Sequence, residues 1–281
     1  MVATVLPANA TNQIITWASS NASGASVSTY GEVTGIIAGS TTITAKAGDK
    51  TATCAVKAKS LPGEGVFING YFWATRNLVS HGKFVENPED YGALFQWGRK
   101  GDGHEQRTSP NYPTNDNSVE NGVVSGSDLD ANGQIVSTHA AYGKFIKTEN
   151  TFYDWCTPKN DVLWNRGTET TPRKTENDPC PAGWRVPTSE ELQSLNFREW
   201  GTLNGVSGFY FGDGANKLFL PAAGYRHCRD GEVIYLGEYG QYWSSSDYFS
   251  SSYYLDFSRS YMKVKGDYRA FGRSVRCIAD L

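Results

Sequence analysis

The sequence predicts an α+β domain with few helices, preceded by a small all-β sandwich. Short runs with strand-like alternation fill residues 5–57, and residues 59–65 (KSLPGEG) have the Pro and Gly content of a linker. Beyond the linker, strand patterns surround one clear helix signal. A length of 281 residues suits two domains at roughly 150 residues per domain. We therefore place the domains at residues 1–60 and 61–281.

The N-terminal domain is predicted from alternation. Ile43 and Ala45, and then Ala52, Cys54 and Val56, alternate with Thr or Lys. A period of two places alternate side chains on one face of a strand, so we expect each set to face the interior. Short strands of this kind, separated by turn residues, are typical of a β-sandwich.

The larger domain is predicted to be mostly strand. Thr188 and Glu191 form a capping-box pattern, and Leu192 and Leu195 follow at helical spacing, so a helix should run from Thr188 to about residue 197 or 198. Pro88 suits a helical turn at residues 87–90. The stretch 98–134, rich in Gly, Asn, Asp and Ser, should be a surface excursion. Strands are expected at 217–220, 233–236, 242–245, 253–257 and 274–278.

Composition excludes several functional classes. A formal net charge of -3, with 26 basic and 29 acidic residues, argues against a nucleic-acid partner. Met1 is followed by no hydrophobic signal core, and no apolar run approaches the roughly 18 residues of a membrane helix. We therefore expect no membrane insertion by this chain, and a signal or anchor outside it.

Metal and cofactor chemistry is not expected. The five cysteines include no CxxC pair and no His at metal-ligand spacing, so disulfides with one thiol left over are the alternative use. Asp128, Asp130 and Asn132 resemble the start of a calcium-binding loop, but the twelfth position is His139 instead of Glu. An Asn-Gly turn is the preferred interpretation.

We expect no enzyme activity. His227 and Cys228 belong to the one dense cluster of reactive residues, but neighbours on a strand point to opposite faces and cannot readily act as base and nucleophile. No base, nucleophile and orienting group can be assembled from the sequence.

The segment 239–273 is the predicted ligand-binding surface, because its Tyr, Ser and Asp content resembles an antibody paratope. The alternative is a β-hairpin whose aromatic residues fill the core, as Tyr253, Leu255 and Phe257 would on one face. The candidate binding residues are Tyr239, Tyr242, Ser246, Asp247, Tyr248, Phe249, Ser251, Tyr253, Arg259, Tyr261, Lys263, Tyr268, Arg269 and Arg273.

The N-terminal motifs LPANAT (6–11), WASSN (17–21) and GEVTG (31–35) resemble the bacterial Ig-like group 2 family over about residues 3–58. Members of that family usually have one or two strands before the first motif, so the module is expected to be truncated. The resemblance implies a spacer in a bacterial surface protein.

The C-terminal motifs DPCPAGWRVPT (178–188), LPAAG (220–224), YWSS (242–245) and GRSVRC (272–277) resemble the Fibrobacter succinogenes major paralogous domain family over about residues 65–281. The resemblance implies a C-type-lectin-like fold. Because Trp, Pro and Gly in such motifs fix turns and fill a core, we expect Trp184, Trp243 and Gly224 to be scaffold residues. The resemblance also implies a disulfide between Cys180 and Cys277, with two buried free thiols as the alternative. In related retroelement variable proteins the stretch before the last strand is the diversified binding surface.

Together, these expectations predict a bacterial cell-surface adhesin or recognition protein that binds a protein or glycan on another cell or host. One alternative is a retroelement-diversified receptor-binding protein, which a phage could encode. Another is a structural subunit of a surface fibre.

Overall fold

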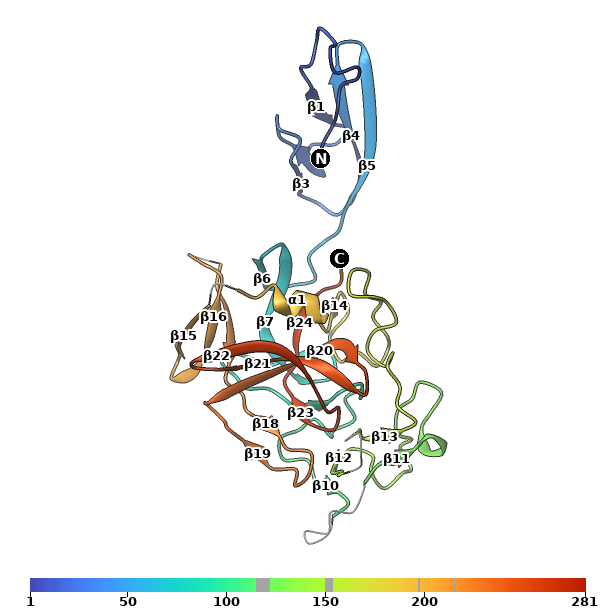
Figure 1. The fold of residues 1–281 in the computed structure, drawn as a ribbon, viewed down its shortest axis with the longest axis vertical. Helices are drawn as coiled ribbons and strands as arrows, with labels where there is room; N and C mark the ends of the chain where they lie inside the picture. The colour runs from blue at the N-terminus through green and yellow to red at the C-terminus, as the bar shows by residue number, and fades with distance from the viewer. Residues whose placement is uncertain (115–121, 150–153, 197, 215) are drawn as a thin grey trace. The chain divides into compact units, whose positions relative to one another are not determined.

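The computed structural model describes residues 1–114, 122–149, 154–196, 198–214 and 216–281. The chain divides into two compact units, Met1–Leu61 and Pro62–Asp280 (Figure 1). Every described sheet belongs to one unit only. Each unit therefore has its own network of strand hydrogen bonds.

The first unit is all β. β4 (Gly39–Ala47) lies between β1 (Thr16–Ser19) and β5 (Lys50–Ala58), and all pairs are antiparallel. A separate ribbon pairs β2 (Ala25–Val27) with β3 (Val33–Gly35). Gly48 and Asp49 connect β4 to β5, and the φ of +60° at Gly48 suits such a two-residue hairpin turn.

The predicted alternation is right for β4 and wrong for part of β5. Ile43 and Ala45 are buried. Ala52 and Cys54, expected on a buried face, are exposed, and Val56 is half-buried. Alternation predicts which side chains share a face, but burial needs a second layer, and nothing in the described unit packs closely over this part of β5.

The described part of the second unit contains four sheets of three or more strands and two strand pairs (Figure 1). In its five-stranded sheet the order is β14-β24-β7-β6, with β8 also paired to β7. The strands of this sheet are β6 (Gly65–Ile68), β7 (Tyr71–Ser80), β8 (Lys83–Phe84), β14 (Trp184–Arg185) and β24 (Arg276–Ala279).

The other sheets have the orders β15-β16-β17, β20-β21-β22 and β19-β18-β23-β9, and two parallel pairs join β10 to β12 and β11 to β13. The strands are β9 (Phe95–Gln96), β10 (Asn111–Tyr112), β11 (Val124–Ser125), β12 (Phe145–Ile146), β13 (Cys156–Thr157), β15 (Arg198–Leu203), β16 (Val206–Phe211), β17 (Leu218–Pro221), β18 (Tyr225–Arg226), β19 (Val233–Ile234), β20 (Tyr239–Tyr248), β21 (Ser251–Ser258), β22 (Tyr261–Asp267) and β23 (Gly272–Arg273). The five strands predicted after residue 209 are therefore present, as β17, β19, β20, β21 and β24, with shifted bounds.

The α+β class predicted for this domain is wrong, because the structure is nearly all β. In the described residues the only α-helix is α1 (Ser189–Gln193), and the only other helical element is the 3-10 turn η1 (Gly126–Asp128). Residues 87–90 form a turn in which the Asp90 N–H donates to the Asn87 carbonyl, not a helix.

The helix begins as predicted and ends early. The Thr188 hydroxyl accepts a hydrogen bond from the Glu191 N–H, and the Glu191 carboxylate accepts one from the Thr188 N–H, so the capping box is present. Arg198 already pairs with Phe211 between β15 and β16. Strand pairing thus takes over where the helix was expected to continue, and residue 197 lies outside the described residues.

Two apolar clusters form the core of the second unit. One contains the buried indoles of Trp97, Trp155, Trp164 and Trp243, and the other packs around Trp73. These four indoles donate to backbone carbonyls at 2.7–3.2 Å, which satisfies their polar atoms in the interior. The predicted scaffold role of Trp243 agrees with this burial.

A disulfide joins β24 to the segment before β14. Cys180 and Cys277 have their sulfur atoms 2.03 Å apart and are separated by 97 residues in the sequence.

Two further residues predicted to be scaffold lie in confined places. Trp184 is buried in the first apolar cluster, which also contains both cysteines of the disulfide. Gly224, with a φ of +63°, leaves no room for a Cβ, which would lie 2.4 Å from the Ile234 carbonyl oxygen. The segments that carry these residues are therefore fixed by covalent and packing constraints.

The segment 98–134 is only partly the surface excursion that its composition predicts. Arg99, His104 and Glu105 are buried, and Arg99 donates to the Gln96 side chain at 2.9 Å and to Asp102 at 2.7 Å. Polar residues can lie in the interior when their hydrogen bonds are satisfied. The polar composition of this segment therefore wrongly predicted a surface position for these three residues. Residues 115–121 lie outside the described residues.

Candidate ligand-binding site

The β20-β21-β22 sheet has one apolar face and one face that mixes polar residues with aromatic ones of the first cluster. Leu255 and Phe257 of β21 and Tyr242 of β20 pack into the cluster around Trp73. Asp256 lies between Leu255 and Phe257 in sequence and so points to the other face. Strand register places the polar residues Gln241 and Lys263 beside Asp256. The period of two thus separates an apolar face from a second face on which Asp256 and Gln241 are only 4% and 6% exposed.

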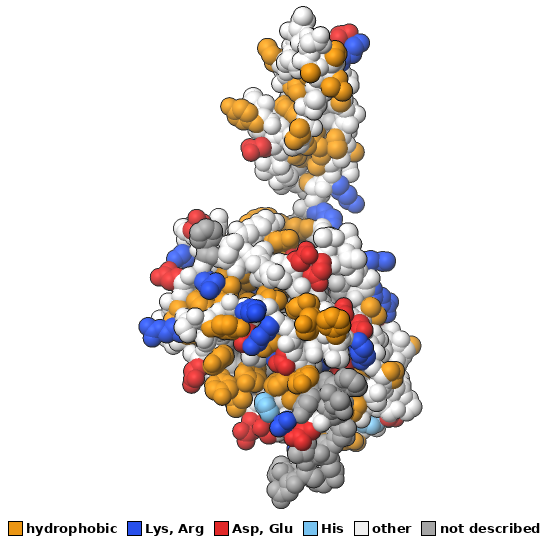
Figure 2. All heavy atoms as spheres, in the orientation of Figure 1, with side chains coloured by type: hydrophobic (Ala, Val, Ile, Leu, Met, Phe, Trp, Pro, Cys, Tyr) orange, Lys and Arg blue, Asp and Glu red, His pale blue; other side chains and the backbone are white. Residues whose placement is uncertain are grey.

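A hollow of about 320 Å³ lies on this second face, and we name it the polar-face pocket. Figure 2 shows hydrophobic side chains interspersed with charged ones over these strands. Segments from β18 to β23 converge on the pocket, although they are up to 48 residues apart in sequence. Its lining residues are Tyr225, Tyr235, Tyr239, Gln241, Tyr254, Asp256, Lys265, Asp267, Phe271 and Arg273.

A chain of hydrogen bonds crosses the floor of the pocket. The Lys265 ammonium lies 2.9 Å from the Asp256 carboxylate, which also accepts from the Gln241 amide at 3.0 Å. The Gln241 carbonyl accepts from Nε of Arg273 at 2.7 Å, and Arg273 pairs with Asp267. Burial alone would lower the pKa of Lys265, but the hydrogen bond and charge of Asp256 raise it above its usual range. Both cations of the floor are therefore paired with carboxylates.

Arg273 is held among aromatic rings. Its Cζ lies 3.7 Å from the centroid of Tyr254, 4.2 Å from that of Trp243 and 4.7 Å from that of Phe271. The side chain is 1% exposed, and its Nη1 is a buried donor without a hydrogen-bond partner. An unsatisfied buried donor costs about 1–3 kcal/mol, so an oxygen atom that reached it would be favoured.

Aromatic side chains form one wall of the pocket. Tyr235 lies 5.1 Å from Tyr239 and 5.8 Å from Tyr225, and Tyr225 lies 5.8 Å from Phe271, between ring centroids. Burial raises the pKa of Tyr225 to about 12, so its hydroxyl stays protonated. Tyr235 has a φ of +57°, a conformation that costs a non-glycine residue of order 1 kcal/mol or more and is found mainly at functional sites.

A second exposed aromatic group lies at the β20–β21 hairpin tip. Phe249 is 79% exposed and has a φ of +53°. Its ring lies 5.1 Å from Tyr248, whose ring lies 4.8 Å from Tyr253. The Lys159 ammonium donates to the Phe249 carbonyl at 2.6 Å and holds the turn. We name Tyr248, Phe249 and Tyr253 the hairpin tip.

Eleven of the fourteen predicted binding residues fall into three places. Tyr239 and Arg273 line the polar-face pocket. Asp247, Tyr248, Phe249, Ser251 and Tyr253 lie at or beside the hairpin tip, and Arg259, Tyr261, Lys263 and Tyr268 are exposed in or beside β22.

Three predicted binding residues are part of the scaffold instead. Tyr242 is fully buried and donates to the Pro221 carbonyl at 2.7 Å. Ser246 is buried and accepts from the Ser189 N–H at 2.9 Å. Arg269 is 1% exposed, stacks on Trp97 and lies 2.6 Å from Asp161. Composition could not distinguish these side chains from their exposed neighbours, because burial depends on the face of the strand.

Sequence reasoning missed most of the pocket floor and part of its wall. Gln241, Asp256 and Lys265 come from three strands, and only the pairing register brings them together. The sequence did carry a signal for these residues, because polar residues alternate there with buried apolar ones. Tyr225 and Tyr235 lie before the segment chosen as the binding surface.

The metal-capable group of the described residues is already satisfied. Asp102, His104 and Glu105 lie close together, but Nδ1 of His104 bonds Asp102 at 2.6 Å and Nε2 accepts from the Gln96 N–H at 3.1 Å. Both ring nitrogens are in use, and burial is the main cause that lowers the pKa of His104. We interpret this group as a structural network.

The reactive cluster at residues 227–230 lacks an activated nucleophile. Cys228 is buried, and burial raises the pKa of its thiol to about 12. His227 lies 3.3 Å from Asp230 and has no contact with the Cys228 sulfur among the described interactions. A thiol with such a raised pKa is mostly protonated near neutral pH and is a poor nucleophile.

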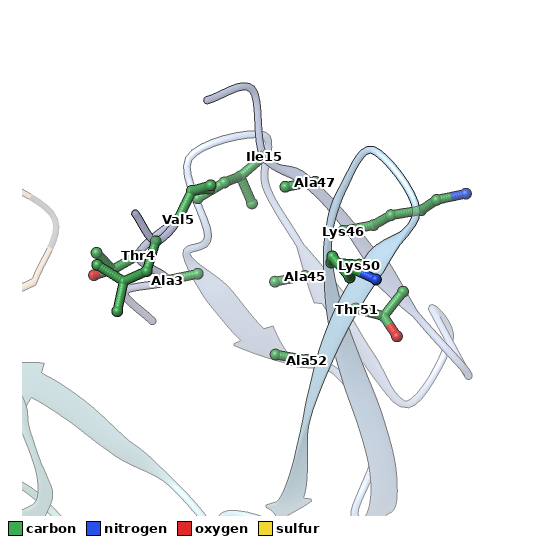
Figure 3. Close-up of a pocket in the computed structure, with 11 residues that line it drawn as sticks. Ala3, Thr4, Val5, Ile15, Ala45, Lys46, Ala47, Lys50, Thr51 and Ala52 are labelled. Carbon is green, nitrogen blue, oxygen red and sulfur yellow. The ribbon is translucent and has the colours of Figure 1, made fainter. Parts of the chain in front are cut away.

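Other hollows offer fewer converging polar groups. In the first unit, Ala45 and Ala52 face Val5 and Ile15 across a gap of about 260 Å³ (Figure 3). Its inner lining is small and aliphatic, which fits a gap in the layers better than a specific site. A shallow hollow of about 490 Å³ in the second unit is lined by parts of residues 79–93 and 106–108.

Comparison with known families matches two parts of the chain. The model for the bacterial Ig-like domain (group 2) matches residues 1–56, and the model for a domain of unknown function (DUF8237) matches residues 210–278. No curated protein matches the chain. The first unit is thus a bacterial Ig-like domain, a kind common in bacterial surface proteins and compatible with a surface role. The second match contains every residue that lines the polar-face pocket.

In the described residues no helix combines the length and apolar character needed to cross a bilayer.

Proposed function

We propose that this protein is a non-enzymatic recognition protein or adhesin of the bacterial cell surface. Its second unit binds a protein or glycan on another cell or host through the polar-face pocket and the hairpin tip, and its Ig-like domain acts as a spacer. Nucleic acid, a metal ion and membrane insertion have no part in the proposal. The polar-face pocket, in which an aromatic wall meets a charged floor, is the observation that carries it.

The chemistry of this surface supports binding. Tyr and Arg are enriched among residues that dominate binding energy at interfaces. Tyr235 and Phe249 hold left-handed backbone conformations while their side chains are 48% and 79% exposed. Such conformations persist only where the surrounding structure enforces them, and here both present an aromatic ring to solvent.

The exposed part of this surface also suits diversification. Asp247, Phe249, Tyr261 and Lys263 are exposed, while Leu255 and Phe257 on the same sheet hold the core. Substitution of the exposed side chains should leave the core unchanged. The resemblance to the Fibrobacter succinogenes family and to retroelement variable proteins remains a prediction. A near-identical repeat beside the gene, differing at adenine-derived positions, would establish the diversified version.

A glycan and surface-protein array tests the proposal. The full chain should bind at least one component, and Tyr239→Ala in the pocket or Phe249→Asn at the tip should reduce the signal. Tyr142→Ala, which removes an exposed tyrosine outside both features, is the control and should bind like the parent. Absence of binding, together with assembly of the chain into oligomers, would favour a structural subunit of a fibre.

A further inference from the structure

We propose that the polar-face pocket binds a neutral hexose residue of a glycan. This inference rests on the proposed function and specifies the ligand class of the same site. Three features of the pocket carry it: balanced charge, donors beside acceptors, and an aromatic wall.

The charges of the floor cancel. Lys265 pairs with Asp256 at 2.9 Å, and Arg273 pairs with Asp267. An anionic ligand would approach two carboxylates, and a cationic ligand would approach an ammonium and a guanidinium. Either would have to break an existing ion pair in a partly desolvated place, which costs more than the new contact returns unless the geometry is better. A neutral ligand keeps both pairs intact.

The floor offers donors and acceptors side by side. An ammonium has three donors, and a carboxylate accepts at about four lone-pair sites, so Lys265 and Asp256 retain capacity beyond their mutual bond. A hydroxyl group donates and accepts at once. Neighbouring hydroxyls on a sugar ring can therefore accept from Lys265 and donate to Asp256, whereas a carbonyl can only accept and an ammonium group can only donate.

Arg273 supplies an unsatisfied donor. Its side chain lines the pocket, is 1% exposed and has a buried Nη1 without a partner. The aromatic rings around its Cζ fix the guanidinium in place. Because Nη1 has almost no accessible surface, a ligand oxygen would reach it only after a small shift of the side chain, and that contact would add a hydrogen bond without adding charge.

The wall and the volume suit a single sugar ring. Tyr235, Tyr239 and Phe271 line the pocket with aromatic rings, against which the C–H face of a pyranose can pack as apolar surface. A volume of about 320 Å³ lies at the low end of the roughly 300–1,000 Å³ of small-molecule sites. One hexose residue is therefore a better match than a long oligosaccharide buried along its length.

Titration calorimetry on the full chain tests this inference with methyl glycosides. The probes are the methyl glycosides of glucose, galactose and mannose, with methyl glucuronide as the acidic analogue and methyl glucosaminide as the cationic one. At least one neutral glycoside should bind about tenfold more tightly than either charged analogue, a difference of about 1.4 kcal/mol. Tighter binding of a charged analogue, or no binding of any neutral glycoside, would overturn the inference.

Variants assign the binding to the pocket. Asp256→Asn should weaken the neutral glycoside about tenfold or more, because an amide replaces one acceptor by a donor. Tyr239→Ala, at the partly exposed wall, should weaken it without loss of the fold, while Tyr142→Ala should have no effect. Unchanged affinity in Tyr239→Ala would contradict the inference even if Asp256→Asn failed to fold.

The array separates this inference from the proposed function. A protein ligand lost in Phe249→Asn but retained in Tyr239→Ala would sustain recognition by the hairpin tip and reject the hexose. If the chain bound no glycan and no protein on the array, both the proposed function and the hexose inference would be rejected.

Discussion

Arg273 lies over the ring of Tyr254, with Cζ 3.7 Å from the ring centroid, the shortest cation–π distance among the described residues. Tyr254 belongs to β21 and Arg273 to β23, so this contact ties the sheet that carries the pocket floor to the neighbouring sheet. The same guanidinium pairs with Asp267 and donates to Gln241. One side chain thus organises both the interior and the pocket.

Replacement of this arginine should destabilise the fold. Arg273→Met removes a buried charge and leaves Asp267 and Gln241 without their donor, so we expect the free energy of unfolding to fall by about 2–4 kcal/mol. Urea denaturation measures it. Arg259→Met, at an exposed arginine, should change it by less than about 0.5 kcal/mol. Equal effects of the two variants would show that the stacked arginine is not structural.

The disulfide should contribute strongly to stability. Cys180 and Cys277 close a loop with a sequence separation of 97 residues, for which the chain-entropy model gives about 4–5 kcal/mol. The double variant Cys180→Ala/Cys277→Ala should lose an amount of that order in urea denaturation. Cys54→Ala, at an exposed free thiol, should behave like the parent. A loss below about 1 kcal/mol in the double variant would contradict this role.

Stability should fall as the pH rises through the titration of Asp178. Burial raises the pKa of this carboxyl to about 6 from the usual 3.8, even though Lys174 favours the charged form. The folded state therefore holds the proton between about pH 4 and 6 while the unfolded state has lost it, and the free energy of unfolding decreases with pH in that window.

Denaturation of the parent and of Asp178→Asn at about pH 4 and pH 7 isolates this contribution. The parent should lose about 2–3 kcal/mol more than the variant over this interval. Parallel pH profiles for the two proteins would mean that the carboxyl is ionised throughout.

A substitution at the hairpin tip should stabilise the chain and weaken ligand binding. Phe249 has a φ of +53°, which Asn tolerates better than Phe, so Phe249→Asn should raise the free energy of unfolding by about 0.5–1 kcal/mol. The same variant should weaken any ligand that contacts the tip. Asn204, which already has a φ of +48°, provides the control, because Asn204→Phe should destabilise the chain. A destabilised Phe249→Asn would show that the exposed ring contributes to folding.

Local patterns predicted local structure well. The alternation of Leu255 and Phe257 with polar residues predicted a strand that turns these two side chains into the core, and Thr188 with Glu191 predicted the start of a helix. The length of the helix was not predictable, because pairing of Arg198 with Phe211 joins residues distant from the helical pattern. The α+β class failed because the capping-box signal led to one short helix, Ser189–Gln193, and the helical turn expected at residues 87–90 did not form.

The candidate site was predictable as a region but not as a pocket. The Tyr-rich composition located the segment 239–273, and the structure places Tyr239 and Arg273 at the pocket. Tyr242 and Arg269 have the same composition signal but face the interior. Membership of the pocket depends on strand register and on the approach of β18 and β19, which are non-local properties.

Hydrogen–deuterium exchange of the full chain, with and without the ligand that the array identifies, tests whether the polar-face pocket and the hairpin tip bind that ligand. We expect slower exchange in peptides from residues 225–273, which contain the pocket and the hairpin tip, and unchanged exchange in residues 1–56. Protection confined to residues 79–108, around the other hollow of the second unit, would contradict this expectation.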